Sequence, residues 1–121
     1  MPSPFAPACA LIVALLPSLQ PARAEAPDRQ RVDRGRVLLS QYQCGACHAI
    51  PGVASAGGGV AQPLAAWSRR SYIAGRVPNR PELLARWIAE PRALVPGTAM
   101  PDMGVGDADA RAMAAYLFSL E

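Results

Sequence analysis

Apolar residues recur with a helical period in three segments of the chain. These segments cover residues 33–43, 81–90 and about 107–120, and their apolar positions fall on one helix face. Together with the Gly- and Pro-rich stretches between them, they predict an all-α fold of helices joined by long loops. The apolar stripes are Val37, Leu38 and Tyr42 in the first segment, Leu83, Leu84, Trp87 and Ile88 in the second, and Ala110, Met113, Ala114, Leu117 and Leu120 in the third.

Residues that cap or break helices mark the expected helix ends. Asp33 and Asp107 are placed to cap the first and third helices, because a carboxylate can accept the free N–H groups of a first turn. Asn79, with Glu82 three residues later, forms the pattern of a capping box for the second helix. Pro91 ends that helix, because proline lacks the N–H that would continue it.

Two segments, residues 50–66 and 94–106, show no amphipathic period and are expected to be loops. Loops this long are uncommon in compact domains unless something organises them, and a large rigid cofactor would do so. Gly35 lies inside the first predicted helix, where Gly costs about 1 kcal/mol relative to Ala. It indicates either a second helix packed closely against it or an unoptimised surface position.

The start of the chain differs from the rest, because its apolar residues form one nearly continuous run. Residues 6–16 form an apolar run interrupted only by Pro7, and Ala-Arg-Ala follows at 22–24. This is typical of a secretory signal peptide, although no Lys or Arg precedes the run. The alternatives are a buried helix or a membrane anchor, but a span needs about 20 apolar residues. We expect residues 1–24 to be cleaved on export to the periplasm, which leaves one domain over residues 25–121.

Charge and size narrow the possibilities. The chain has 12 basic residues, all of them arginine, against 9 acidic ones. The arginines are dispersed, whereas nucleic-acid binding requires a clustered basic face, so no nucleic-acid partner is expected. A small domain rich in Gly and Pro buries little surface and usually needs a disulfide, a metal or a cofactor to stabilise it.

The segment Cys44-Gly45-Ala46-Cys47-His48 is a candidate site for such a stabilising cofactor. C-x-x-C-H is the attachment pattern of c-type haem: two thiols add to the haem vinyl groups, and the adjacent imidazole reaches the iron. His48 is the single histidine of the chain, and Cys44 and Cys47 are the only cysteines beyond the predicted leader. We therefore predict one haem c (iron), bound covalently through Cys44 and Cys47 and ligated by His48.

Three other interpretations of the motif fit less well. A thioredoxin-like redox pair would need a βαβ context, which the pattern does not show. A zinc site needs four ligands, and two cysteines with one histidine fall short of that number. A disulfide between Cys44 and Cys47 would close a loop too small to stabilise the fold much.

A haem iron held by His48 has a second axial position to fill. Met113 lies on the stripe of the last helix, where core packing is its expected role. Met100 and Met103 lie in the loop of residues 94–106 and are the better candidates. A thioether is a soft ligand, and His/Met ligation raises the reduction potential.

With these elements the chain resembles the class I cytochrome c family over nearly all of its predicted mature length. Its middle and end are similar to the cytochrome c domains fused to the copper subunit of some bacterial haem–copper oxidases. The resemblance implies N- and C-terminal helices that cross, with a third helix and long loops wrapping the haem. The matching residues are Gly35…Tyr42-Gln43-Cys44-Gly45-Ala46-Cys47-His48, Asn79…Leu83…Trp87-Ile88…Pro91, Pro96-Gly97-Thr98-Ala99-Met100-Pro101 and Ala115-Tyr116-Leu117…Leu120.

The resemblance also assigns roles to individual residues. The family's loop ligand is the Met of a Met-Pro pair, which selects Met100. Gly35 would be the small residue at the helix crossing, against Tyr116 and Leu117. Contacts with the haem propionates would come from Trp87 and from one of Tyr72, Arg69 and Arg70, and we carry Trp87, Tyr72 and Arg70 forward as candidates.

One departure from the family concerns the second nitrogen of the His48 ring. In the family this nitrogen donates to a Pro carbonyl in a Gly-Pro pair, but here the segment reads Ala61-Gln62-Pro63-Leu64. The acceptor could be the carbonyl of Gln62 or that of Pro63. Such a bond fixes the tautomer and tunes the metal.

The expected function is one-electron transfer, without enzymatic activity or a small-molecule substrate. The monomeric protein would serve a respiratory chain between redox partners such as a dehydrogenase or a terminal oxidase. The alternatives are a subunit through which electrons enter a larger dehydrogenase or oxidase complex, and a haem enzyme or gas-binding protein with an open sixth site. Apolar loop residues around Val53, Ala54 and Ala61 would form the docking patch.

Overall fold

The computed structural model describes Met1 and residues 29–54 and 59–121. The predicted signal peptide lies outside these residues, apart from Met1. Among the described helices, none combines the length and the hydropathy required to cross a membrane.

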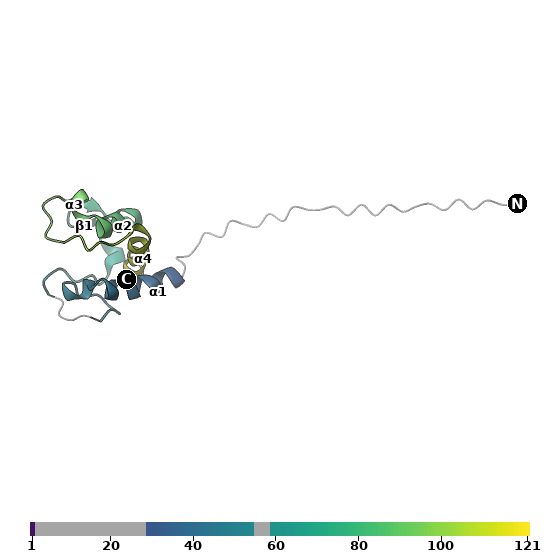
Figure 1. The fold of residues 1–121 in the computed structure, drawn as a ribbon, viewed down its shortest axis with the longest axis horizontal. Coiled ribbons are helices and arrows are strands. Elements are labelled where there is room, and N and C mark those ends of the chain that lie inside the picture. The colour runs from purple at the N-terminus through teal and green to yellow at the C-terminus, as the bar shows by residue number, and fades with distance from the viewer. Residues whose placement is uncertain (2–28, 55–58) are drawn as a thin grey trace.

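The described residues are mainly helical, and this confirms the all-α expectation (Figure 1). The three predicted helices are present, and a short fourth one follows the second. A two-residue antiparallel strand pair, which the sequence pattern did not predict, pairs Tyr72 with Pro78 and Ile73 with Val77. The elements in order are α1 (Arg29–Gln41), the 3₁₀ turns η1 (Cys44–Ala46) and η2 (Trp67–Arg69), β1 (Tyr72–Ile73), β2 (Val77–Pro78), α2 (Pro81–Ala89), α3 (Pro91–Leu94) and α4 (Asp107–Phe118).

Two of the predicted helix caps are wrong. Helix α1 begins at Arg29, so Asp33 lies inside it and cannot serve as its cap. Helix α2 has Arg80 at its N-cap, without a side-chain bond. The Asn79 side chain instead donates from Nδ2 to the carbonyls of Trp67 (3.1 Å) and Arg70 (3.0 Å). The capping pattern was local, but the partners of Asn79 come from an earlier segment.

The other helix ends deviate less. The third predicted cap is also wrong, by one residue, because Asp107 is the first residue of α4 and Gly106 occupies the cap position. It ends at Phe118, two residues before Leu120. Pro91 ends α2 and at once begins α3, where the missing N–H of a first-turn proline has no cost.

Helices α1 and α4 cross at Gly35. A Cβ on Gly35 would overlap the carbonyl group of Ala112 and lie 3.0 Å from the Cβ of Tyr116. The structure thus decides between the two explanations of this glycine, because another helix does pack closely against it. Tyr116 is a partner as expected, and Ala112 takes the place that we expected for Leu117.

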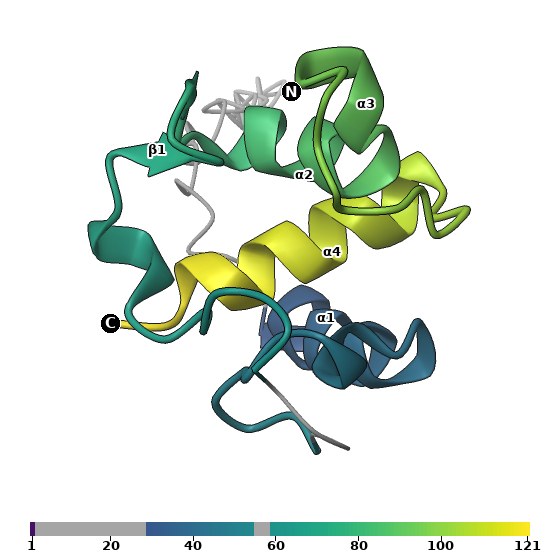
Figure 2. The same cartoon turned by 90° about the vertical axis from the view of Figure 1, so that its left-hand side faces the viewer.

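Helix α4 forms the centre of the hydrophobic core. It packs against α1 on one side and α2 on the other, and in Figure 2 α1 lies below α4 while α2 and α3 lie above it. The C-terminal end of α4 is tied to η2, because the N–H and hydroxyl of Ser68 both donate to the carbonyl of Leu120, at 3.1 and 2.8 Å. The fully buried side chains include Leu39, Ile73, Leu84, Pro91 and Met113.

Candidate cofactor-attachment site

The C-x-x-C-H segment follows directly from the end of α1. Gln43 adopts a left-handed backbone conformation (φ 57°), which ends the helix. The chain then makes one 3₁₀ turn, in which the N–H groups of Cys47 and His48 donate to the carbonyl of Cys44 at 3.3 and 3.0 Å. Cys44 and Cys47 are both half-buried and not joined in a disulfide. The turn thus holds two free thiols and the imidazole on one rigid segment.

The environment of Cys44 differs from that of a redox-active cysteine. Burial raises the pKa of its thiol above the ordinary value, and the nearby Cys47 acts in the same direction. Redox-active C-x-x-C pairs instead have a lowered pKa, which populates the thiolate. The site therefore favours a structural or attachment role for the two thiols.

The His48 ring is oriented by a backbone carbonyl. Its Nδ1 lies 2.7 Å from the carbonyl oxygen of Gln62. A carbonyl can only accept, so Nδ1 carries the proton and Nε2 keeps a free lone pair. Of the two acceptors left open by the sequence, the structure selects Gln62. The half-buried ring is thus prepared to ligate a metal through Nε2.

Backbone hydrogen bonds join the loop that provides this carbonyl to the attachment segment, residues 44–48, and to Ala49. The N–H groups of Gly59 and Ala61 both donate to the carbonyl of Cys47, at 3.3 and 2.9 Å. The N–H of Leu64 donates to the carbonyl of Ala49 at 2.8 Å. These bonds hold Gln62 in register with the ring of His48.

The three candidate methionines have different environments. Met113 is completely buried in the core, as its stripe position predicted. Met100 is half-buried and packs against the core, and its N–H donates to Oγ1 of Thr98 at 3.2 Å. Met103 is 44% exposed. The loop that bears Met100 runs above α4 in Figure 2, on the side opposite α1 and η1.

The structure places the three candidate propionate contacts differently. Trp87 is buried in the core, whereas Tyr72 is 58% exposed on the strand pair. Arg70 lies 4.9 Å from the ring centroid of Trp67 and donates hydrogen bonds to the carbonyls of Pro63 and Ala65. Arg69, the neighbour of Arg70, is exposed.

Trp67 is a candidate site residue that the sequence analysis missed. It is 5% exposed, and its indole Nε1–H is buried without a hydrogen-bond partner. The side-chain Oδ1 of Asn79 is likewise buried and unpaired. Because an unmet buried polar group costs about 1–3 kcal/mol, these atoms indicate a missing polar partner. The available signal was a tryptophan two residues before the Arg69-Arg70 pair.

The donor set fits haem better than zinc. In residues 29–54 and 59–121, no three His, Cys, Asp or Glu side chains converge as they would around a metal ion. Haem requires only the attachment thiols and one imidazole with a free Nε2, and Cys44, Cys47 and His48 provide these. Its carboxylates are acceptors of the kind that the unpaired Nε1–H of Trp67 lacks.

The expected docking patch needs a correction. Val53 is buried, with 9% of its surface exposed, and therefore cannot form part of an exposed surface. Ala54 is exposed and Ala61 is half-buried, and among the described residues of this loop the large apolar side chain at the surface is Val60, which is 82% exposed. Its neighbours Gly59 and Ala61 both bond to Cys47, so Val60 lies close to the attachment segment.

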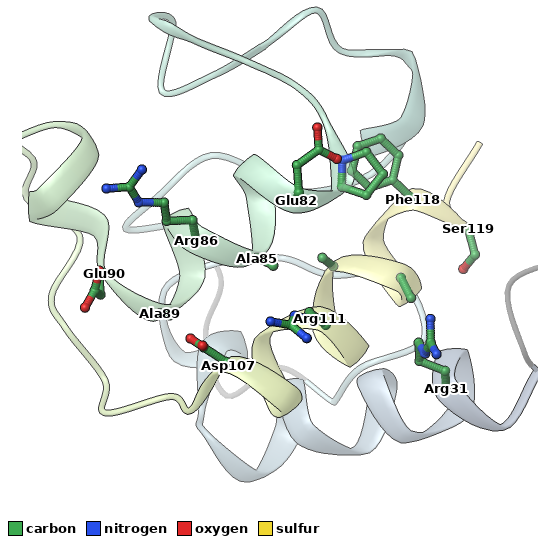
Figure 3. Close-up of a pocket in the computed structure, with 13 residues that line it drawn as sticks. Arg31, Glu82, Ala85, Arg86, Ala89, Glu90, Asp107, Arg111, Phe118 and Ser119 are labelled. Carbon is green, nitrogen blue, oxygen red and sulfur yellow. The ribbon is translucent and has the colours of Figure 1, made fainter.

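A groove of the described residues lies elsewhere. It has a volume of about 870 Å³ and runs between α2 and α4, with Arg31 of α1 at one end (Figure 3). Alanines alternate with charged side chains of both signs along it. None of the predicted site residues lines this groove.

Comparisons with known proteins agree with the geometry of the site. The family model described as Cytochrome c matches residues 32–121. The cytochrome c oxidase subunit 2 of Alkalihalophilus pseudofirmus is 33% identical over 101 residues, which make up 83% of this chain and 29% of that protein. The chain thus spans less than a third of the length of this relative.

Proposed function

The chain belongs to the cytochrome c family, and we propose that it is a periplasmic one-electron carrier with haem c attached to Cys44 and Cys47 and ligated by His48 and Met100. The hydrogen bond between His48 Nδ1 and the Gln62 carbonyl is the main support for this proposal. It leaves the Nε2 lone pair free, in the residue that follows two free thiols at attachment spacing.

Each residue of the site has a separate task. The haem iron supplies the chemistry, because it gains and loses one electron. Cys44 and Cys47 anchor the group, and His48 holds it from the side of the attachment segment. With a second strong ligand on the opposite face, no position stays open for a substrate, so we propose electron transfer without catalysis.

Burial supports Met100 as the second ligand. A ligand must lie at the interior of the site, and Met100 packs against the core while Met103 is 44% exposed. The bond from the Met100 N–H to Thr98 fixes the backbone at this position. A fixed thioether changes little in position between the two oxidation states, which favours rapid electron exchange.

The periplasmic location rests on the sequence. The apolar run of residues 6–16 and the Ala-Arg-Ala site after it resemble an export signal. We propose that cleavage after Ala24 releases the mature domain.

A second candidate function keeps the same chemistry within a larger assembly. The relative from Alkalihalophilus pseudofirmus is named as an oxidase subunit, and it is much longer than this chain. This chain could likewise serve as the subunit through which electrons enter an oxidase or dehydrogenase. Co-purification with such an enzyme after mild extraction would support the subunit, whereas a monomer that exchanges electrons with separate partners would support the diffusing carrier.

Haem attachment can be tested by mass spectrometry of the chain expressed with a haem-maturation system. We expect the mass of the mature chain plus one haem. Cys44→Ser and Cys47→Ser should each lose one thioether bond, and His48→Ala should yield no stable holoprotein. A folded, haem-free His48→Ala domain in good yield would contradict the proposal, because the cofactor forms much of the core.

A further inference from the structure

Arg70 contacts the backbone segment whose Gln62 carbonyl bonds to the ring of His48. Its guanidinium donates hydrogen bonds to the carbonyl of Pro63 and, at 3.4 Å, to that of Ala65. Pro63 directly follows Gln62, whose carbonyl accepts the proton of the His48 ring. The carbonyls bound by Arg70 Nη2 and by His48 thus belong to adjacent planar peptide units, joined at the Cα of Pro63, whose φ is fixed by its ring.

The segment of residues 62–65 is held from both sides. On the inner side, the His48 ring bonds to Gln62, and Leu64 donates to the carbonyl of Ala49 at 2.8 Å. On the outer side, Arg70 donates to the carbonyls of Pro63 and Ala65, and it is the side chain that does so among the described residues. Without Arg70, one side of this short segment would lose its side-chain support.

Arg70 is itself fixed in place. Its guanidinium stacks on the indole of Trp67, 4.9 Å from the ring centroid, in a cation–π arrangement. Asn79 donates to the carbonyls of both Trp67 and Arg70. Over the described ranges, no carboxylate lies within ion-pair distance of Arg70, since the one pair there joins Arg34 and Asp109. The guanidinium therefore acts on neutral backbone carbonyls.

We propose that Arg70 is a positioning residue for the His48 ligand. Its terminal Nη2 donates to the carbonyls of both Pro63 and Ala65, and through them it aligns the Gln62 carbonyl with Nδ1–H of His48. This role differs from the propionate contact expected for Arg70. It rests on the proposed function, because the alignment matters when the ring ligates iron.

The proposal predicts the direction of a change in reduction potential. A well-aligned acceptor at Nδ1–H makes the imidazole a stronger donor, which stabilises oxidised iron and lowers the potential. Loss of alignment should therefore raise the potential. If Arg70 only neutralised a propionate, its replacement by a neutral residue would remove a positive charge near the haem. That loss would lower the reduction potential.

Arg70→Lys separates these two effects. Lysine keeps the charge but lacks the planar guanidinium that stacks on the Trp67 ring, so its ammonium is not held against the two carbonyls. Arg69→Lys is the matched control, because Arg69 is adjacent, exposed and without a described hydrogen bond or ion pair through its side chain. Arg70→Gln removes both the guanidinium and its charge, and Asn79→Ala loosens the support of Arg70 without altering charge.

The experiment compares these variants as reduced holoproteins by NMR and by redox titration. In Arg70→Lys, we expect the His48 Nδ1–H to exchange with solvent about three- to tenfold faster, as for the loss of one hydrogen bond, and the potential to rise. Asn79→Ala should shift the exchange rate and the potential in the same directions as Arg70→Lys does. Arg69→Lys should change neither quantity.

Unchanged exchange and potential in Arg70→Lys would overturn the proposal. A lower potential in Arg70→Gln with no effect of Arg70→Lys would assign Arg70 to charge neutralisation instead. Failure of the proposed function is distinguishable, because it would appear in the unmutated protein as a spectrum without His/Met ligation.

Discussion

Gly35 in α1 lies against the carbonyl group of Ala112 in α4 so closely that a Cβ on Gly35 would overlap it. The contact is backbone against backbone, so no flexible side chain can move aside. The two helices therefore cross at a distance that only glycine permits. Because η1 follows α1 directly, this crossing also sets where the attachment segment lies relative to α4.

Gly35→Ala tests this crossing. Helix propensity alone would make the variant more stable by about 1 kcal/mol, whereas overpacking costs about 1–3 kcal/mol. We expect net destabilisation, measured as a lower midpoint of urea unfolding. Gly97→Ala is the control, because nothing lies within 4 Å of a Cβ at Gly97. A Gly35→Ala protein at least as stable as the wild type would show that the helices do not meet here.

The choice between the two loop methionines can be decided by substitution. Met100→Ala should retain the covalent haem, lower the reduction potential and open the sixth coordination site to carbon monoxide. Met103→Ala removes the same side chain from an exposed position three residues away and should change none of these. Visible absorption and redox titration measure both variants. The reverse outcome would assign the ligand to Met103.

Tyr116 connects α4 to the loop after the attachment segment. Its hydroxyl donates to the carbonyl of Pro51 at 2.6 Å. Tyr116→Phe should therefore reduce the free energy of unfolding by about 0.5–1.5 kcal/mol, the usual contribution of one hydrogen bond. Tyr72→Phe alters an exposed ring and should have little effect. Equal stability of the two variants would mean that the Tyr116 bond contributes nothing to the fold.

The stability of the fold should depend on pH through Asp109. The Arg34 guanidinium, 2.6 Å away, holds the pKa of Asp109 below its usual range, and a bond from Tyr42 acts in the same direction. A lowered pKa in the folded chain stabilises the fold above the unfolded value of about 3.9, and this contribution is lost as pH falls through the folded value.

Unfolding of Asp109→Asn across a pH series tests this dependence. The variant should be less stable than the wild type at neutral pH, and the difference should disappear as the pH falls through the lowered pKa of Asp109. A double-mutant cycle with Arg34→Gln isolates the pair. A difference that stays constant over the acid range would show that the effect of Asp109 is not ionic.

The hydrogen bond from Tyr42 to Asp109 should also make the stability of the fold depend on pH in the alkaline range. The hydrogen bond to Asp109 holds the pKa of Tyr42 above its usual range, because a neutral phenol can donate to the carboxylate and a phenolate cannot. This contribution is present below the unfolded value of about 10 and is lost as pH rises through the higher folded value. Tyr42→Phe should remove this loss, as measured by unfolding between about pH 9 and 12. A wild type and a Tyr42→Phe variant with parallel alkaline profiles would argue against it.

Features set by local periodicity could be predicted from the sequence. The stripes of α2 and α4 placed Leu84 and Met113 in the core, and both are fully buried. The spacing within Cys44–His48 predicts haem attachment without knowledge of the fold. In each case the signal lies within a few residues.

Features set by contacts between distant segments could not be predicted. Asn79 fits a local capping pattern, but its side chain bonds to carbonyls that only the folded chain brings near. Val53 and Val60 belong to the same loop and are chemically identical, yet one is buried and the other is exposed. Their exposure depends on how the loop folds back on Cys47, which no periodicity encodes.

The central claim is a haem held by His48 and Met100, and an absorption spectrum tests it most directly. The protein is expressed with haem-maturation machinery and measured oxidised, then reduced, then with carbon monoxide. The account predicts a sharp c-type α-band on reduction, a weak long-wavelength iron–thioether band when oxidised, and no response to carbon monoxide. A high-spin oxidised spectrum with rapid carbon monoxide binding would contradict it and would indicate an open site that acts on a small molecule.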